Sequence, residues 1–342
     1  MPRCGVATCV VVAAMLLLSG CHLAPRPVAQ PDPQAAVEGA LASLEQQAVA
    51  AYRFASGATF TATKGGLARG TLTLADAQVP ALRVGGHLYL RAPAAYWSAQ
   101  GMTPERATAY GARWARSVLA LDPGMALAPD VLAQALRSAI PSGTRAHLLT
   151  LGDGTQLYDV QGLQVTAAEP FRVTSFEPAL LGPAGPPALG NTAVEVHPVG
   201  PDGRADVRTG LDGDLDGLGQ PFVAGPVVAT KVTDNSLSCT AAGACTDRVQ
   251  VGTELIGEAP EAQARLVLRS SVTSSELGTR DCGQELVTPL HASVSLSCGV
   301  KFDLPKVAGA AQVAAVPTVT AEPVAVVDVA RVKREIASAL GR

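Results

Sequence analysis

The sequence predicts an α+β fold followed by an all-β sandwich, and two changes of pattern along the chain predict it. In the first half, stretches with apolar residues at helical spacing are interspersed with short stretches that alternate apolar and polar residues. Beyond about residue 221 the helical spacing gives way to short strands at the intervals common in β-sandwiches. Residues 199–220 are rich in Gly, Asp and Pro and are interpreted as a linker between an α+β domain (34–198) and a sandwich (221–320).

The first predicted element is a helix over residues 34–51, where Val37, Leu41 and Leu44 recur on one face behind Pro33. Several strands follow it, with Gly65-Gly66 and Gly85-Gly86 as hairpin turns. These strands are expected at residues 52–63, 67–74, 81–84 and 87–90. This part therefore reads as a helix followed by a β-meander.

Two more helices interrupt the strands. Thr103-Pro104-Glu105 is a start signal for a helical stretch through residues 110–116, and Pro129-Asp130 begins another that carries Leu132 and Leu136. Strands resume at residues 146–151, 156–160, 171–176 and 193–196. The arrangement predicts helices inserted in an antiparallel sheet.

The N-terminus has the features of an export signal. Arg3 supplies a positive start, residues 10–18 are almost uninterruptedly apolar, and the small residues Ser19 and Gly20 precede Cys21. The apolar run is too short to span a membrane. Residues 1–20 are therefore predicted to be a signal peptide.

Leu18-Ser19-Gly20-Cys21 resembles the lipobox of bacterial lipoproteins. The resemblance implies that a diacylglyceryl group is bonded to the sulfur of Cys21, that the signal is cut before this residue, and that the new amine is acylated. Two or three acyl chains anchor a protein durably, since each buried methylene contributes about 0.8 kcal/mol. The expectation is a protein lipid-anchored on the extracytoplasmic face of the cell membrane. The alternative is an ordinary cleavable signal in which Cys21 has no role.

Residues 21–33 are rich in Pro and lack apolar periodicity, which predicts an extended, solvated tether. The abundance of Ala, Gly, Arg and Val with little Lys indicates a high-GC actinobacterium. In Gram-negative lipoproteins His22 after the cysteine would favour the outer membrane, so the membrane concerned stays open.

In the second half, strands are expected at residues 227–232, 247–255, 264–272 and 292–296. Four cysteines lie among them: Cys239, Cys245, Cys282 and Cys298. Export favours disulfides, and chain order favours Cys239 with Cys245 and Cys282 with Cys298, although four cysteines allow three pairings. Zinc is the weaker alternative, because there is no Cys-x-x-Cys and His291 is the only histidine nearby.

The first domain combines a leading helix with Tyr52-x-Phe54, residues 82–90 (Leu-Arg-Val-Gly-Gly-His-Leu-Tyr-Leu), Trp97 and residues 111–114 (Gly-Ala-Arg-Trp). This set of features resembles that of the actinobacterial lipoproteins of the LppX and LprG type. It implies a lipoprotein-carrier-like fold, in which helices cover the concave face of a curved sheet and enclose a cavity for acyl chains. The candidate ligand contacts are Tyr52, Phe54, Tyr89, Trp97 and Trp114, each of which has a simpler interpretation as core packing.

Two features near domain ends have competing interpretations. Asp212-Gly213-Asp214-Leu215-Asp216-Gly217 matches the first half of a calcium loop, but the twelfth position is Val223 where a bidentate Glu belongs, so an acidic linker is favoured over a weak calcium site. Residues 321–342 end in an amphipathic helix pattern. Its apolar face is expected to pack on its own domain, with a membrane or partner as the alternative.

The net charge and the absence of catalytic motifs limit the classes of function that are expected. With 26 basic and 29 acidic side chains the chain has a formal net charge of −3, which argues against nucleic-acid binding. It carries no Gly-x-Ser-x-Gly, His-Glu-x-x-His or phosphate-binding glycine loop, so no enzyme and no cofactor are expected. The prediction is an envelope lipoprotein that binds or carries a lipid; the alternative is a non-catalytic scaffold or sensor that binds another envelope protein and has no cavity.

Overall fold

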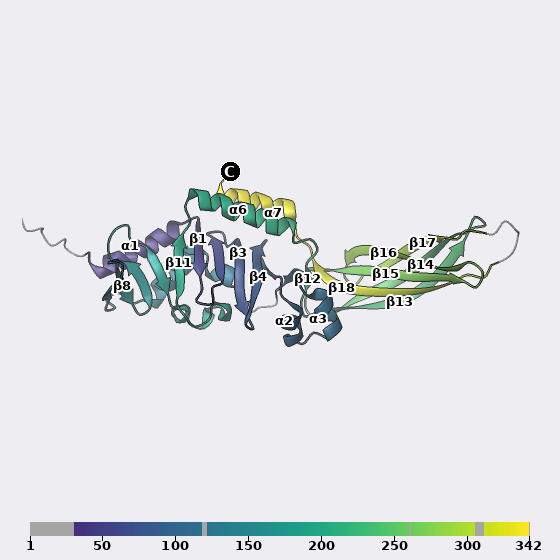
Figure 1. Ribbon diagram of the computed structural model, residues 1–342, viewed down its shortest axis with the longest axis horizontal. Coiled ribbons are helices and arrows are strands. Elements are labelled where there is room, and N and C mark those ends of the chain that lie inside the picture. Colours follow the sequence, from purple (N-terminus) through teal and green to yellow (C-terminus); the bar gives the residue numbers. More distant parts are fainter. Residues whose placement is uncertain (1–30, 118–121, 260, 305–310, 342) are drawn as a thin grey trace, which may run out of the picture.

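The computed structural model describes residues 31–117, 122–259, 261–304 and 311–341 and has an elongated α+β fold (Figure 1). One sheet of 15 strands runs through both halves, in the order β16-β15-β18-β12-β6-β5-β4-β3-β2-β1-β11-β10-β9-β8-β7. A second sheet has the order β13-β14-β17. In the first half the strands run across the long axis of the molecule, whereas in the second half they run along it (Figure 1).

Among the described residues, the first half contains eleven strands of the large sheet. They are β1 (Val49–Arg53), β2 (Thr59–Thr63), β3 (Ala68–Leu74), β4 (Ala77–Val84), β5 (His87–Leu90), β6 (Ala115–Arg116), β7 (His147–Thr150), β8 (Gln156–Val160), β9 (Leu163–Thr166), β10 (Val173–Phe176) and β11 (Val194–Pro198). Each pairs antiparallel with its neighbours in this half. Because β11 pairs with β1, β7 to β11 extend the sheet outward from the first strand.

Five helices cover one face of this sheet. They are α1 (Pro33–Gln46), α2 (Ala94–Ala99), α3 (Pro104–Tyr110), α4 (Pro123–Ala126) and α5 (Pro129–Ala139). Two 3-10 segments, Pro178–Ala184 and Pro187–Leu189, lie between β10 and β11. Apolar side chains of α1 and α5 pack with alternate residues of the strands in one large core, as the period of two along a strand requires.

Several predicted elements of this half are confirmed, with changed limits. The helix expected at residues 34–51 ends at Gln46, because the strand-forming run from Val49 takes the next residues into β1. The strand expected at 52–63 is two strands, joined by a turn in which Gly57 has a φ of 81°. The helix after Thr103 ends at Tyr110, and β9 was not predicted.

The composition of residues 199–220 predicted an irregular linker, but the structure has a helix there. Residues Pro201–Asp216 form helix α6, although three glycines lie inside it and lower its intrinsic helix propensity. Tertiary packing stabilises it, because Leu211 and Leu215 are fully buried against the face of the sheet opposite α1 and α5.

The C-terminal helix α7 (Val329–Leu340) exists as predicted, but it lies over the sheet of the first half, in a core that also includes Ala262 and Ala325 of the second half. It lies beside α6, with Val332 and Ile336 in the same core as Leu211 and Leu215 (Figure 1). Lys333 Nζ lies 2.7 Å from Asp216 Oδ1, and Asp328 begins the helix by accepting a hydrogen bond from the backbone N–H of Arg331. The two helices therefore form a second helical layer, so the first half has helices on both faces of its sheet.

The second half is a β-sandwich. It consists of β13 (Val227–Cys239), β14 (Ala244–Ile256), β15 (Ala262–Ser274), β16 (Gly278–Pro289), β17 (Ser293–Lys301) and β18 (Ala314–Ala325). The sheet β13-β14-β17 packs on β16-β15-β18 through Val, Leu and Ala side chains. The strands are longer than predicted, β16 was not predicted, and β18 crosses the boundary expected at residues 320–321.

A single two-residue strand, β12 (Phe222–Val223), continues the large sheet from one half into the other. It pairs in parallel with β6, where Phe222 is opposite Ala115, and antiparallel with β18, where Phe222 is opposite Val324. The backbone N–H of Phe222 donates to the carbonyl of Trp114 at 3.1 Å. We call strand β12 and the residues that contact it the joint.

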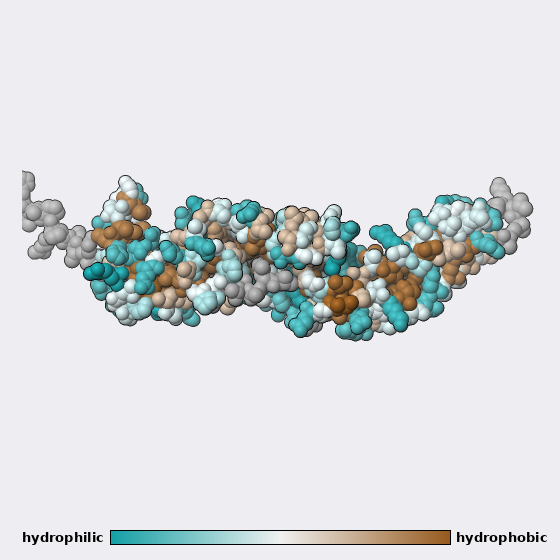
Figure 2. Space-filling model, turned by 90° about the horizontal axis from the view of Figure 1, so that it is seen from below, coloured by the Kyte–Doolittle hydropathy of each residue, from teal (hydrophilic) through white to brown (hydrophobic). Residues whose placement is uncertain are grey.

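Within the described residues, no helix is long and apolar enough to cross a membrane. Viewed from below, the surface is mixed, and apolar side chains gather near the base of the sandwich (Figure 2). Val227 and Ile256, opposite each other in β13 and β14, are exposed.

Candidate functional site

The five aromatic residues predicted to contact a ligand do not share one site. Tyr52, Phe54 and Trp97 lie in the core between the sheet and helices α1 to α5. Tyr89 and Trp114 lie in the core on the opposite face, under α6 and α7. Successive residues of a strand point to opposite faces of the sheet. Aromatic residues that are near one another in the sequence can therefore lie in different cores.

The polar ends of two of these aromatics, Tyr52 and Trp97, are hydrogen-bonded inside the protein. The Tyr52 hydroxyl donates to the carbonyl of Leu127 at 2.6 Å, and Trp97 Nε1 donates to the carbonyl of Ala92 at 3.2 Å. Burial raises the pKa of Tyr52 far above its usual value and raises that of Tyr89 to about 12. This is the environment of aromatic residues that pack a core.

A small hollow lies where the start of α1 meets the segment after α5. Val37, Ile140, Ala146 and Val160 line it, and its volume is about 40 Å³. That is room for about one or two water molecules and not for an acyl chain.

The joint brings together residues from distant parts of the chain. The Phe222 ring is stacked on Tyr110 with centroids 4.1 Å apart, and it meets Trp97 edge to face at 5.2 Å. Arg113 lies over the Tyr110 and Phe222 rings, 5.3 Å and 5.6 Å from their centroids. Ala112, in the left-handed region with a φ of 63°, turns the chain just before Arg113.

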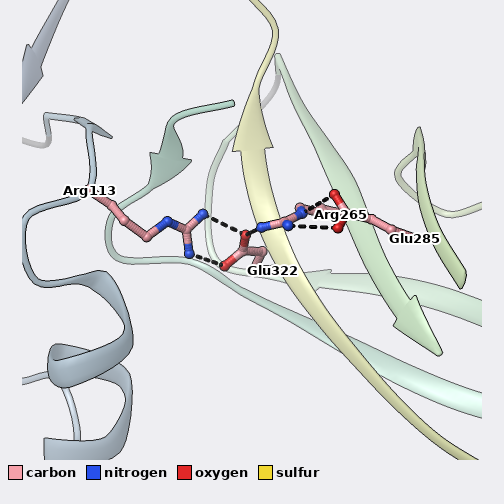
Figure 3. Close-up of polar contacts among 4 residues, drawn as sticks. All are labelled: Arg113, Arg265, Glu285 and Glu322. Atoms are coloured by element: carbon pink, nitrogen blue, oxygen red, sulfur yellow. Dashed lines mark hydrogen bonds and ion pairs between the residues drawn. The ribbon is translucent and has the colours of Figure 1, made fainter. Parts of the chain in front are cut away.

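An ion-pair network of Arg113, Glu322, Arg265 and Glu285 connects the loop after α3 with the sandwich (Figure 3). Arg113 donates from both terminal nitrogens to Glu322, at 3.0 Å and 2.8 Å. Arg265 Nη1 donates to the same carboxylate at 2.8 Å, while its Nε and Nη2 donate to Glu285 at 2.5 Å and 2.7 Å. Glu322 therefore connects the loop after α3 with strands β15, β16 and β18.

Glu322 is the least exposed member of this network, with 14% of its side chain accessible. Burial by itself would raise its pKa, but the hydrogen bonds from Arg113 and Arg265 more than offset burial and hold the pKa below its ordinary value of 4.5. The pKa of Glu285 is also lowered, chiefly by the hydrogen bonds from Arg265. Both carboxylates are therefore ionised at neutral pH, where they pair with the arginines of the joint.

Replacing Glu322 with glutamine is expected to lower the free energy of unfolding by about 2 kcal/mol at neutral pH. The change removes the charge that two arginines share, in a partly desolvated position. Because the folded pKa is lowered, this contribution is present above the ordinary pKa and is lost as the pH falls through the lowered value. Chemical denaturation at a series of pH values measures both effects.

Glu285→Gln is the matched control, because Glu285 pairs with the same Arg265 but 46% of its side chain is exposed. It is expected to cost less than 1 kcal/mol, as surface ion pairs do. Equal losses in the two variants would contradict a special role for Glu322.

The calcium alternative at Asp212, Asp214 and Asp216 is not supported by the local geometry. The three residues lie on helix α6 and not on a loop, and each carboxylate lies nearest a different cation: Arg208, Arg69 and Lys333, respectively. In the part of the chain that the structure describes, no group of three or more His, Cys, Asp or Glu residues is placed to hold a metal ion.

The four cysteines form the two disulfides favoured by chain order, Cys239–Cys245 and Cys282–Cys298. The first joins register partners of the β13-β14 hairpin. The second joins β16 to β17, so it links the two sheets of the sandwich. The lipidation candidate Cys21, the signal peptide and most of the tether lie outside the described residues.

Sequence reasoning missed the joint. Phe222, Arg113, Arg265 and Glu322 are separated by up to 209 residues, and nothing in their spacing indicates that they meet. For α6, by contrast, the sequence did carry a signal, since Val207, Leu211 and Leu215 recur every four residues.

Comparisons with protein-family models, with curated proteins and with solved structures found no match to this chain.

Proposed function

We propose that this chain is a bacterial envelope lipoprotein, anchored through Cys21, that acts without catalysis as an extended scaffold and presents its β-sandwich to an envelope partner. The observation that carries the proposal is the order of the large sheet. Strands β7 and β8 lie at one end of this sheet, and the sandwich strand β16 lies at the other.

The described chain begins at the end far from the sandwich. The Tyr158 hydroxyl of β8 donates to the carbonyl of Pro31 at 2.8 Å, so α1 starts beside β8 (Figure 1). Cys21 precedes Pro31 by ten residues. An anchor at Cys21 is therefore closest to one end of the molecule, and the sandwich projects from the other.

The dimensions suit a spacer. Eleven strands at a spacing of about 4.8 Å span about 50 Å, and a strand of 13 residues adds about 40 Å. A core filled by bonded aromatics and a hollow of about 40 Å³ support a scaffold over a carrier.

Two measurements on the protein purified from its native membrane test the proposal. Mass spectrometry is expected to find Cys21 acylated and residues 1–20 absent. Neutron reflectometry of this protein in a supported bilayer is expected to show a protein layer about 80 to 100 Å thick, because the long axis stands off the surface. The Cys21→Ala variant is expected to form no layer.

An unmodified Cys21 thiol, or a signal still attached, would refute the anchor. A layer about 30 Å thick would show that the molecule lies flat and would refute the spacer even if Cys21 is acylated. The two parts of the proposal therefore fail separately.

Lipid carriage is the second candidate, and one specific observation favours it. The core between the sheet and helices α1 and α5 consists of packed apolar side chains, so an acyl chain that displaced α5 would meet an apolar wall. The chain produced without its signal is expected to contain no bound lipid if the scaffold is correct. One lipid per protein in an organic extract would instead establish the carrier.

A further inference from the structure

A depression beside the joint is lined by three arginines from separate segments. Arg91 follows β5, Arg113 follows α3, and Arg265 lies on β15; Trp114 and Gln220 are among the other residues that line it. Its volume is about 470 Å³, which is ample for a small hydrated anion. The ion pairs that connect the two halves use Arg113 and Arg265, but they do not use Arg91.

The arginines are not all neutralised. Glu322 pairs with Arg113 and Arg265, and Glu285 pairs with Arg265. Among the described residues, no carboxylate lies within ion-pair distance of Arg91. Three guanidinium groups therefore face two carboxylates, which leaves the depression with a positive charge.

Two of these guanidinium groups are held by aromatic rings before any ligand arrives. Arg91 lies 5.2 Å from the centroid of the Trp114 ring, and Arg113 lies over Tyr110 and Phe222. Both terminal nitrogens of Arg113 already donate to Glu322, whereas Arg91 has no carboxylate partner among the described residues. An arginine stacked by its face presents its N–H donors at the edge of the plane, where those of Arg91 match the oxygens of a phosphate. Gln220 adds an amide donor to the same lining.

We propose that this depression binds a phosphate-type oxyanion, with Arg91 as its main contact. The chemistry is the same for free phosphate and for the phosphate of a lipid headgroup. In either case the negative charge of the ligand pairs with Arg91, which has no carboxylate partner among the described residues. The ligand then lies beside the ion pairs that connect the two halves.

The test uses the mature chain with Cys21→Ala and inorganic phosphate as the probe, at constant ionic strength with chloride as reference. Fluorescence reports on the site, because the chain has two tryptophans and one of them, Trp114, lies under Arg91. Saturable quenching by phosphate and not by chloride is expected. Arg91→Gln is expected to weaken phosphate binding at least about tenfold, the loss of one charge-assisted bidentate contact.

Arg53→Gln is the control, since Arg53 is an exposed arginine on β1 with a single 3.8 Å ion pair to Glu195. It is expected to leave phosphate affinity unchanged. If both variants weaken phosphate binding equally, phosphate is attracted by the overall positive charge of the surface arginines, and the proposed site is refuted. Thermal melts of both variants confirm that they fold.

Vesicles of phosphatidylcholine with and without phosphatidic acid distinguish the two sources of phosphate. Cosedimentation only with phosphatidic acid, lost in Arg91→Gln, identifies a lipid headgroup. Phosphate binding without cosedimentation identifies a soluble phosphate. Failure of both phosphate and phosphatidic acid to bind would refute the proposal, and would leave the Cys21 anchor and the scaffold untouched.

Discussion

Replacing Phe222 with alanine is expected to lower the free energy of unfolding by about 3 to 5 kcal/mol, as for other fully buried phenylalanines. The ring is stacked on Tyr110 and meets Trp97, while its backbone continues the large sheet from β6 to β18. The variant is therefore expected to uncouple the two halves. Calorimetry should show one cooperative transition in the parent protein and two in Phe222→Ala.

Phe302→Ala is the matched control. Phe302 is equally buried, but it packs with Cys245 and Val272 in a separate core of the sandwich. It is expected to cost a similar free energy while small-angle scattering still shows the extended shape of the parent. A single transition in Phe222→Ala, or the same change of shape in both variants, would show that the joint does not couple the halves.

Removal of the Cys282–Cys298 disulfide is expected to cost about 3 kcal/mol. This bridge closes a 16-residue separation and joins the two sheets of the sandwich, so without it the unfolded chain gains entropy and β16 and β17 lose their covalent link. The Cys282→Ala/Cys298→Ala double variant should show a lower denaturation midpoint, measured by circular dichroism.

The Cys239–Cys245 bridge provides the comparison. Its separation is only six residues, and the β13-β14 pairing already holds its two ends opposite each other. The Cys239→Ala/Cys245→Ala variant is expected to lose less stability than the first pair. A larger loss in this variant would contradict the view that the Cys282–Cys298 bridge is the one that stabilises the sandwich.

The sequence predicted elements whose signals are local and missed elements that depend on tertiary packing. Strand β5 and the hairpin at Gly85-Gly86 were predicted with their limits, because turn chemistry and a period of two are local properties. Helix α6 was mistaken for a linker, since its glycines weaken the local signal and its stability comes from packing with α7 and the sheet. The positions of the five candidate ligand contacts depended on tertiary structure in the same way, since the sheet places them in cores on opposite faces.

The sequence by itself determined the α+β class and the sandwich pattern, because both depend on neighbours within a few tens of residues. It favoured the observed cysteine pairing by chain order but left three pairings open, and the structure decided among them. Only the tertiary structure decided that one sheet joins the two halves, that α6 and α7 pack as a pair, and that Arg113, Arg265 and Glu322 meet at the joint. These contacts close long loops, and their free energy comes from burial and charge neutralisation that exist only once distant segments are in place.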